Sequence, residues 1–163
     1  IIGITVIKFD AQDISKRKNI LEDVEKNGKY DFVISTHILE DLNHPKLLCE
    51  VINRIGKAGF VSMPSKYAEL TVFEYKYQLP YAGYHHHRWI YQIKNDVLIG
   101  YPKMNFLDYV DFEFNKQVAH HSEIAFLWED SFDYEFIAPD QLMDNRQGHN
   151  RITDLFEDDE LIL

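Results

Sequence analysis

Histidines gather in one short stretch of the chain, where their imidazoles could act as bases or hold a metal ion. Three follow one another at residues 85–87, flanked by Tyr84, Arg88 and Trp89. In an extended segment, neighbouring side chains point to opposite faces, so His86 would face away from the histidine on either side. This alternation disfavours a three-ligand metal cage made by the run alone, and we assign no metal ligand. We expect instead an acceptor-binding wall, in which Tyr84 and Trp89 stack on a small molecule and Arg88 or a histidine makes polar contacts.

Two of these histidines, His86 and His87, are candidate catalytic bases together with His37. We expect at least one of the pair to lie near His37 and to take a proton from an acceptor hydroxyl. An unperturbed imidazole titrates near ~6.5, so it is an available base at neutral pH. The alternatives are a structural role, in which the rings hydrogen bond the backbone, and a metal site. Further ligands for such a metal site would be His120, His121, Asp108 and Asp111.

Polar residues also follow two expected strands at the point where each strand ends. Asp10 closes the apolar run 1–9, and Thr36 and His37 follow the run 30–34. Ligands of open α/β sheets bind just beyond the carboxyl ends of the strands. We therefore expect Asp10 and the Thr36–His37 pair to open on one crevice, where an acid can accept a hydrogen bond from a ribose or adenine group. The alternative is that Asp10 only begins the following turn.

The elements that must position these residues alternate between strand and helix up to Pro64. Runs rich in β-branched and aromatic residues predict strands, and apolar residues at helical spacing predict the helices between them. The strands are expected at 1–9, 30–34 and 60–63, and the helices at 16–26 and 45–55. Near-continuous apolarity in these strands is typical of a parallel sheet that is covered on both faces.

After Ser65 the pattern changes to paired strands. One hairpin is expected at 88–93 and 97–101, and another at 124–128 and 132–137. The predicted fold is therefore a single α/β domain, with a mostly parallel sheet and antiparallel strands at its C-terminal edge. Within it, residues 1–64 would form the cofactor side, 65–155 the acceptor side and 156–163 an acidic tail.

The composition limits the classes of partner. The 163 residues include 17 basic and 27 acidic side chains, which gives a formal net charge of -10. Such an acidic chain lacks the basic face that nucleic acid or an anionic membrane surface requires. No apolar run approaches the ~18 residues of a membrane span, and the single cysteine, Cys49, cannot form an intramolecular disulfide. We therefore expect a cytoplasmic protein whose partner is a small molecule, with other domains of a longer chain as additional partners.

Several of these segments, taken together, resemble class I S-adenosylmethionine-dependent methyltransferases. The family's acid-small-acid stretch after a strand is matched by Asp10-Ala11-Gln12-Asp13. Its Asp-hydrophobic strand, which ends in polar residues and a Leu-Glu pair, is matched by residues 30–40. Its Lys-Pro-Gly-Gly-like turn is partly matched by Lys57-Ala58-Gly59. The resemblance covers residues 4–64, and the family's Gly-rich loop after its first strand has no counterpart.

The resemblance implies a Rossmann-like fold, incomplete at its N-terminal side, with S-adenosylmethionine as cofactor. Asp10 and Ala11 would lie near the adenosine, and Thr36 and His37 near the methyl-donor pocket. The acceptor would be a small hydroxyl-bearing molecule, for example a sugar, and the protein an O-methyltransferase. Without the Gly-rich loop, we expect the chain by itself to bind the cofactor weakly or not at all, and residues before Ile1 to complete the site. The alternatives are a catalytically inert methyltransferase-like module or C-terminal fragment acting in a larger chain, and a metal-dependent enzyme built on the histidines.

Overall fold

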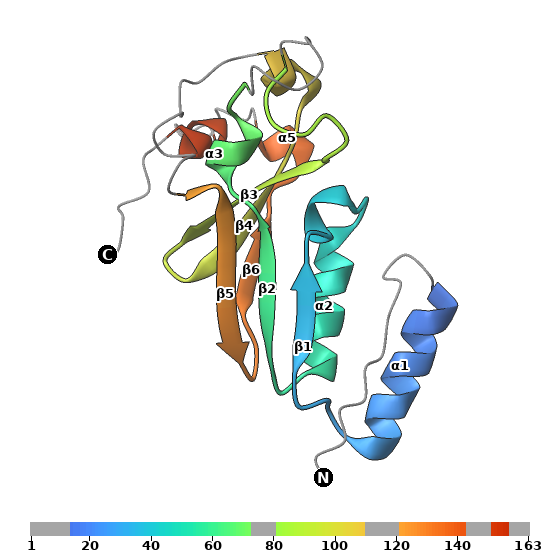
Figure 1. Ribbon diagram of the computed structural model, residues 1–163. Helices are drawn as coiled ribbons and strands as arrows, with labels where there is room; N and C mark the ends of the chain where they lie inside the picture. Colours follow the sequence, from blue (N-terminus) through green and yellow to red (C-terminus); the bar gives the residue numbers. More distant parts are fainter. Residues whose placement is uncertain (1–13, 73–80, 110–120, 143–150, 157–163) are drawn as a thin grey trace.

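The computed structural model describes residues 14–72, 81–109, 121–142 and 151–156 (Figure 1). The first half contains α1 (Ile14–Asn27), β1 (Val33–Thr36), the 3₁₀ turn η1 (Leu39–Asp41), α2 (Pro45–Ile55), β2 (Ala58–Pro64) and α3 (Lys66–Glu69). The second half contains β3 (Trp89–Lys94), β4 (Val97–Pro102), η2 (Asn105–Tyr109), β5 (Glu123–Glu129), β6 (Asp133–Phe136), α5 (Pro139–Leu142) and η3 (Arg151–Leu155).

The described strands form two small mixed sheets, so the predicted Rossmann-like, mostly parallel sheet is wrong (Figure 1). In the first sheet β1 runs parallel to β2, and β5 pairs with the other side of β2 antiparallel. In the second sheet β4 pairs antiparallel with β3 and parallel with β6. The physical reason lies after β2, where α3 has only 4 residues. The described part of the chain between β2 and β3 contains no longer helix that could cover a continued parallel sheet, and β3 pairs instead with β4, the next strand along the chain.

Several individual helices and strands form where the sequence predicts them, although the predicted sheet does not. The β1–α2–β2 unit is present, and Pro45 occupies the first turn of α2, where its missing N–H costs nothing. The hairpin of β3 and β4 is also confirmed, and it turns at Asn95 and Asp96. The second expected hairpin is wrong. Its strands, β5 and β6, belong to different sheets, because β5 pairs with β2 and β6 pairs with β4.

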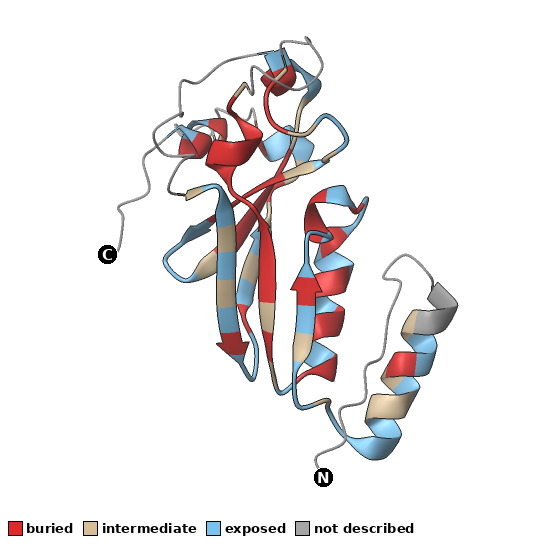
Figure 2. Cartoon of the chain, in the orientation of Figure 1, coloured by how far each residue is buried: buried red, intermediate tan, exposed pale blue. Residues whose placement is uncertain are grey.

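Burial within β1 alternates, contrary to the expected strand covered on both faces. Ile34 is 68% exposed, while the next residue, Ser35, is buried. Leu127 of β5, which lies in the same cross-strand row, is 73% exposed. Exposed and half-buried residues also alternate along most of β5 (Figure 2). One face of the first sheet therefore packs on the core and the other meets solvent, as in many antiparallel sheets.

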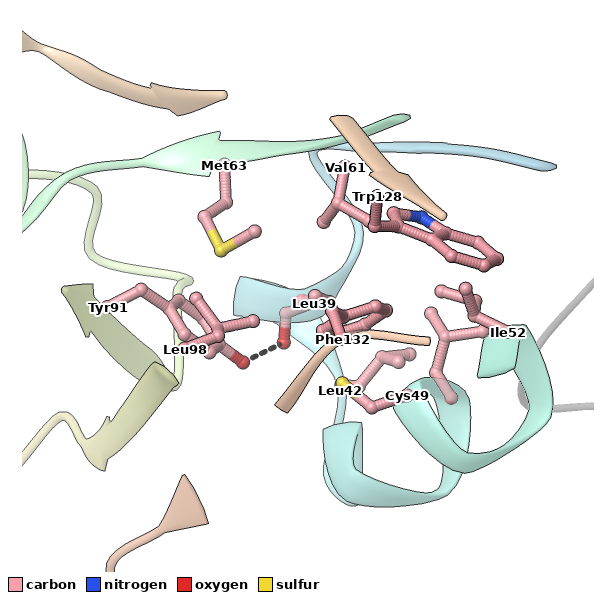
Figure 3. Packing of buried hydrophobic residues seen from close by; sticks show 11 residues of the cluster. Leu39, Leu42, Cys49, Ile52, Val61, Met63, Tyr91, Leu98, Trp128 and Phe132 are labelled. Carbon is pink, nitrogen blue, oxygen red and sulfur yellow. Dashed lines mark hydrogen bonds between the residues drawn. The ribbon is translucent and has the colours of Figure 1, made fainter. Parts of the chain in front are cut away.

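The main core lies between the inner face of the first sheet, α2 and the second sheet. Figure 3 shows Val61 and Met63 of β2 opposite Cys49 and Ile52 of α2. Tyr91 brings in the second sheet, and its hydroxyl donates to the Leu39 carbonyl in η1 at 3.0 Å. Each fully buried large apolar side chain contributes about 1.5–3 kcal/mol relative to an exposed one, so this shared cluster joins the two sheets. A second cluster packs Leu70, Ile90, Ile99, Tyr101, Leu107, Ile137, Leu142, Ile152 and Leu155.

Candidate active site

β1 ends at Thr36, and His37 follows, so both lie at the carboxyl end of a parallel strand. The His37 N–H donates to the Ser62 carbonyl at 2.9 Å. The φ of His37 is 49°, in the left-handed region that non-glycine residues rarely adopt. Where they do adopt it, the residue is often part of a functional site. Its half-exposed ring lies between two carboxylates, with Nδ1 3.4 Å from Glu40 Oε1 and Nε2 3.2 Å from Glu123 Oε1. Each ring nitrogen therefore faces a carboxylate oxygen.

The histidine run is a turn rather than an extended segment, so the expected alternation of its side chains is wrong. The chain turns at His85 and His86, and β3 begins only after the run. The His86 and His87 rings therefore lie together, with centroids 4.5 Å apart, and the Tyr84 ring is 4.6 Å from that of His87. His85 contacts a different group, because its Nδ1 is 3.4 Å from Asp108 Oδ2.

Backbone and side-chain bonds hold the segment after the histidines against η1. The Arg88 N–H donates to the Glu40 carbonyl at 2.7 Å, and the Trp89 indole N–H donates to the Leu42 carbonyl at 2.8 Å. Because η1 directly follows the end of β1, the histidine turn lies beside the residues that close that strand. The end of β1 and the histidine turn, which lie far apart in the sequence, therefore border one region.

The three residues expected to bind an acceptor have different surroundings. Arg88 is exposed, and its side chain is accessible to a ligand. Tyr84 is half-buried beside His87. Trp89 packs edge-on against Phe136 with ring centroids 5.3 Å apart, and its indole N–H is used by the bond to Leu42, the residue just after η1. The indole thus holds the second sheet against η1.

A buried ion network holds His87 in place. His87 Nδ1 lies 2.5 Å from Glu69 Oε1, and the other carboxylate oxygen of Glu69 accepts from Lys103 Nζ at 3.0 Å. Lys103 also donates to two backbone carbonyls and lies 3.2 Å from Asp108 Oδ1. The Glu69 and Lys103 side chains are only 1% and 2% exposed. Because the Glu69 carboxylate is paired with Lys103, Nδ1 of His87 is assigned as the donor to it, and in the neutral imidazole Nε2 is then the nitrogen with the lone pair.

Gly83 lets the loop before the histidines pass close to this network. A Cβ at Gly83 would lie 2.5 Å from the Glu69 carbonyl oxygen, and its φ is +59°. A larger residue at this position would clash with the carbonyl and would be strained at this dihedral angle, whereas glycine meets neither cost. The glycine therefore allows the histidine turn to lie against Glu69.

Glu40 is a buried carboxylate near both His37 and His87. Burial raises the pKa of Glu40, while its backbone hydrogen bond and the charges of His87 and His37 lower it. Its Oε2 is buried and has no hydrogen-bond partner among the described residues. A buried acceptor left without a donor costs about 1–3 kcal/mol, and a cation placed beside Glu40 would offset that cost.

Three side chains near η1 bring metal-ligating atoms together: Asp41, His86 and His87 (the Asp-His-His triad). One ligand atom from each lies within 4.8 Å of the others. His87 Nε2 is 4.0 Å from Asp41 Oδ1. Two imidazoles and one carboxylate are a donor set that suits divalent zinc or iron. The triad combines the last residue of η1 with the histidine turn that packs beside it.

The other residues expected in the site lie outside the described residues. These are the adenosine-side Asp10 and Ala11, and two of the alternative metal ligands, Asp111 and His120. Their position relative to Thr36 and His37 stays a prediction.

Sequence reasoning missed Asp41, Glu69 and Lys103. Asp41 had a usable signal, because it follows Glu40 directly after a strand that closes in polar residues. Glu69 and Lys103 had none, since charged residues are almost never fully buried unless paired, and the pairing forms only in the folded chain. The charged residues that fix His87 are therefore visible only in three dimensions.

In comparisons with known proteins, the chain matches no family model, no curated protein and no solved structure. Among the described helices, none is long and apolar enough to cross a membrane.

Proposed function

We propose that this site transfers a methyl group from S-adenosylmethionine to a hydroxyl of a small acceptor, for example a sugar. The observation that supports the proposal most is the packing of the histidine turn on η1. Thr36 and His37, expected beside the methyl donor, then border the same region as His86 and His87, expected beside the acceptor. Methyl transfer depends on bringing the two reactants together in line, and such positioning supplies much of the rate.

The charges around η1 suit a cationic methyl donor. The orphaned oxygen of Glu40 and the half-exposed carboxylates of Asp41 and Glu123 lie close to the end of β1. Carboxylates without a full set of cationic partners attract a positive sulfonium. When bound, the cofactor supplies a methyl group whose bond to sulfur breaks as its bond to the acceptor oxygen forms.

Within this proposal His37 is the general base. Its half-exposed ring accepts the proton of the acceptor hydroxyl, and the carboxylates of Glu40 and Glu123 stabilise the resulting imidazolium. The oxygen's electron pair forms the new bond to carbon, and the proton leaves His37 to water afterwards. His86, His87 and Tyr84 line the acceptor side and orient the hydroxyl.

The test measures transfer of labelled methyl from S-adenosylmethionine to a panel of sugars and phenols by the full natural protein. His37→Ala should lower turnover by about 10²–10⁴-fold and leave donor affinity near wild type, because a positioned base is lost. His44→Ala is the matched control. His44 is an exposed histidine just before α2 whose side chain makes no capping bond, so turnover should not change.

Two results would contradict the proposal. One is the absence of donor binding to the full protein, which leaves the inert methyltransferase-like module as the function. The other is equal turnover in His37→Ala and His44→Ala, which would exclude His37 as the base.

A further inference from the structure

We infer that the Asp-His-His triad binds a divalent transition-metal ion of the zinc class. Asp41, His86 and His87 place one carboxylate oxygen and two imidazole nitrogens within 4.8 Å of one another. Three protein ligands of this kind, with a further position left for water or substrate, are the usual donor set of catalytic zinc sites. Oxygen-preferring ions such as Mg²⁺ would bind this nitrogen-rich set poorly.

The orientation of His87 is the strongest argument for a metal. Its Nδ1 lies against the buried Glu69 carboxylate and its Nε2 faces Asp41, so in the neutral imidazole with Nδ1 as donor, the lone pair lies on the nitrogen that points to the other ligands. Metal-bound histidines almost always donate their other N–H to a carboxylate or carbonyl, which fixes the tautomer and makes the ligand more basic. Glu69 itself is held by Lys103, so the ring is fixed before any ion arrives.

The remaining ligands are close enough to complete the site by side-chain rotation. Tetrahedral ligands at zinc-ligand distances of about 2.0–2.1 Å lie about 3.4 Å apart, compared with 4.0 Å between Asp41 Oδ1 and His87 Nε2. The Asp41 side chain is 46% exposed and His86 is exposed, so both can rotate without disturbing the core. One fixed ligand and two adjustable ones can therefore close on an ion.

The local charge also favours a cation. Glu69, Asp108 and Glu40 are buried near His87 or its network, and Asp41 adds a fourth carboxylate. Within this described cluster the permanently charged cation is Lys103, which already pairs with Glu69 and Asp108. A divalent ion bound by Asp41 would reduce the excess negative charge.

A metal ion in this place would bind an oxygen at its open position. Coordination lowers the pKa of water from about 15.7 to about 7 in favourable sites, and a hydroxyl is activated in the same way. In the proposed methyl transfer, that oxygen would be the acceptor hydroxyl. This role rests on the proposed function, whereas ion binding itself does not.

The test is calorimetric titration of the full protein with Zn²⁺, together with Co²⁺ titration followed by visible absorption. We expect one equivalent of ion to bind and Co²⁺ to give the absorption of a site with nitrogen and oxygen ligands. Asp41→Asn, His86→Ala and His87→Ala should each weaken binding by about 100-fold or more. Glu69→Gln removes only the orienting carboxylate, and it should weaken binding by about 10–100-fold while the ligands remain.

His85→Ala is the matched control, since His85 is in the same run but contacts Asp108 instead of the triad. It should bind Zn²⁺ as the wild type does. Equal losses in His85→Ala and His86→Ala would overturn the inference, as would the absence of stoichiometric binding to the wild type. The exposed Asp41→Asn variant keeps the test valid if Glu69→Gln unfolds. Because cofactor and acceptor are absent from the titration, failed methyl transfer and failed ion binding give separate results.

Discussion

Three histidines of this chain have different surroundings, because each contacts different carboxylates. His87 is tied to buried Glu69, His37 lies between Glu40 and Glu123, and His85 contacts Asp108. A carboxylate beside an imidazole selects the tautomer and therefore decides which nitrogen is left for a proton or a metal. The residue types pointed to proton or metal chemistry, but the partner of each ring decides between them.

The sequence could single out His37, His86 and His87 as candidates, but it could not show how two of them meet. The expectation of alternating faces assumed an extended backbone. The close approach of Gly83 to Glu69 and the turn at His85 and His86 arise from contacts between distant parts of the chain. Local patterns cannot show such contacts, and for this reason the triad was missed.

Cys49 makes the stability of the protein sensitive to alkaline pH. Its side chain is 0% exposed, and burial raises the pKa of the thiol from 9.0 to about 12. Below pH 9 the thiol is protonated in both states, so its contribution to stability is complete. Between pH 9 and 12 only the unfolded chain loses the proton, and the free energy of unfolding should fall by about 1.4 kcal/mol per pH unit.

Urea unfolding at pH 8, 9 and 10 tests this prediction. Cys49→Ala should be less stable at every pH because a core contact is lost, but its stability should fall less between pH 9 and 10. Equal slopes for wild type and variant would show that the thiol does not titrate as expected. Burial also raises the pKa values of Tyr91 and Tyr101, so these two residues should lower the free energy of unfolding further above pH 10.

At the scale of elements, the sequence predicted those helices and hairpins that depend only on a short stretch of residues. Periodic apolar residues predicted α2, and the asparagine-aspartate turn between apolar runs predicted the hairpin of β3 and β4. The allocation of strands to sheets could not be predicted. Phe132 to Phe136 alternate as a hairpin partner of β5 would, but Phe136 packs on Trp89 and Tyr91 of the second sheet instead. Strand pairing is a non-local choice, and both pairings satisfy the same alternation.

The turn of the β3–β4 hairpin carries a strain that a single substitution can relieve. Asn95 and Asp96 have φ of 53° and 62°, the left-handed values of a type I′ turn. Asparagine followed by glycine is preferred in such turns, because glycine adopts positive φ without a steric cost. Asp96→Gly should therefore raise the free energy of unfolding by about 0.5–1 kcal/mol.

Thermal or urea unfolding measures this gain, and Asp96→Ala serves as the control. Alanine removes the same carboxylate but keeps a Cβ at positive φ, so it should destabilise the hairpin. If alanine stabilises the protein as much as glycine does, the effect comes from the lost charge and not from the backbone.

At the scale of the whole molecule, one asparagine fastens α2 to the chain just before β6. The Asn53 amide donates to the Phe132 carbonyl at 2.9 Å, and its oxygen accepts from the Phe132 N–H at 3.1 Å. The two residues are 79 positions apart in the sequence. This pair of bonds fixes Phe132 where its ring packs on Trp128 in the main core.

Asn53→Ala should lower the free energy of unfolding by about 1–3 kcal/mol, since it leaves partly buried backbone groups of Phe132 without partners. Asn27→Ala is the comparison, because Asn27 makes an exposed bond to Asp23 within α1, and its loss should stay within about 0.5 kcal/mol. Urea unfolding of both variants measures these two losses in the free energy of unfolding. Similar small losses in the two variants would mean that water hydrogen bonds the Phe132 N–H and carbonyl as well as Asn53 does.

The position of β2 between β1 and β5 has a consequence for how the protein is made. β2 obtains its first neighbour from the chain just before it, but its second neighbour, β5, begins only at Glu123. At a synthesis rate of 5–20 residues per second, the intervening stretch of about 60 residues takes about 3–12 s to emerge from the ribosome. During that time the edge of β2 that later pairs with β5 has unpaired backbone groups, and Val61 and Met63 lack part of their cover. An unpaired strand edge beside exposed apolar side chains favours misassociation, so this interval is a point at which a chaperone would protect the nascent chain.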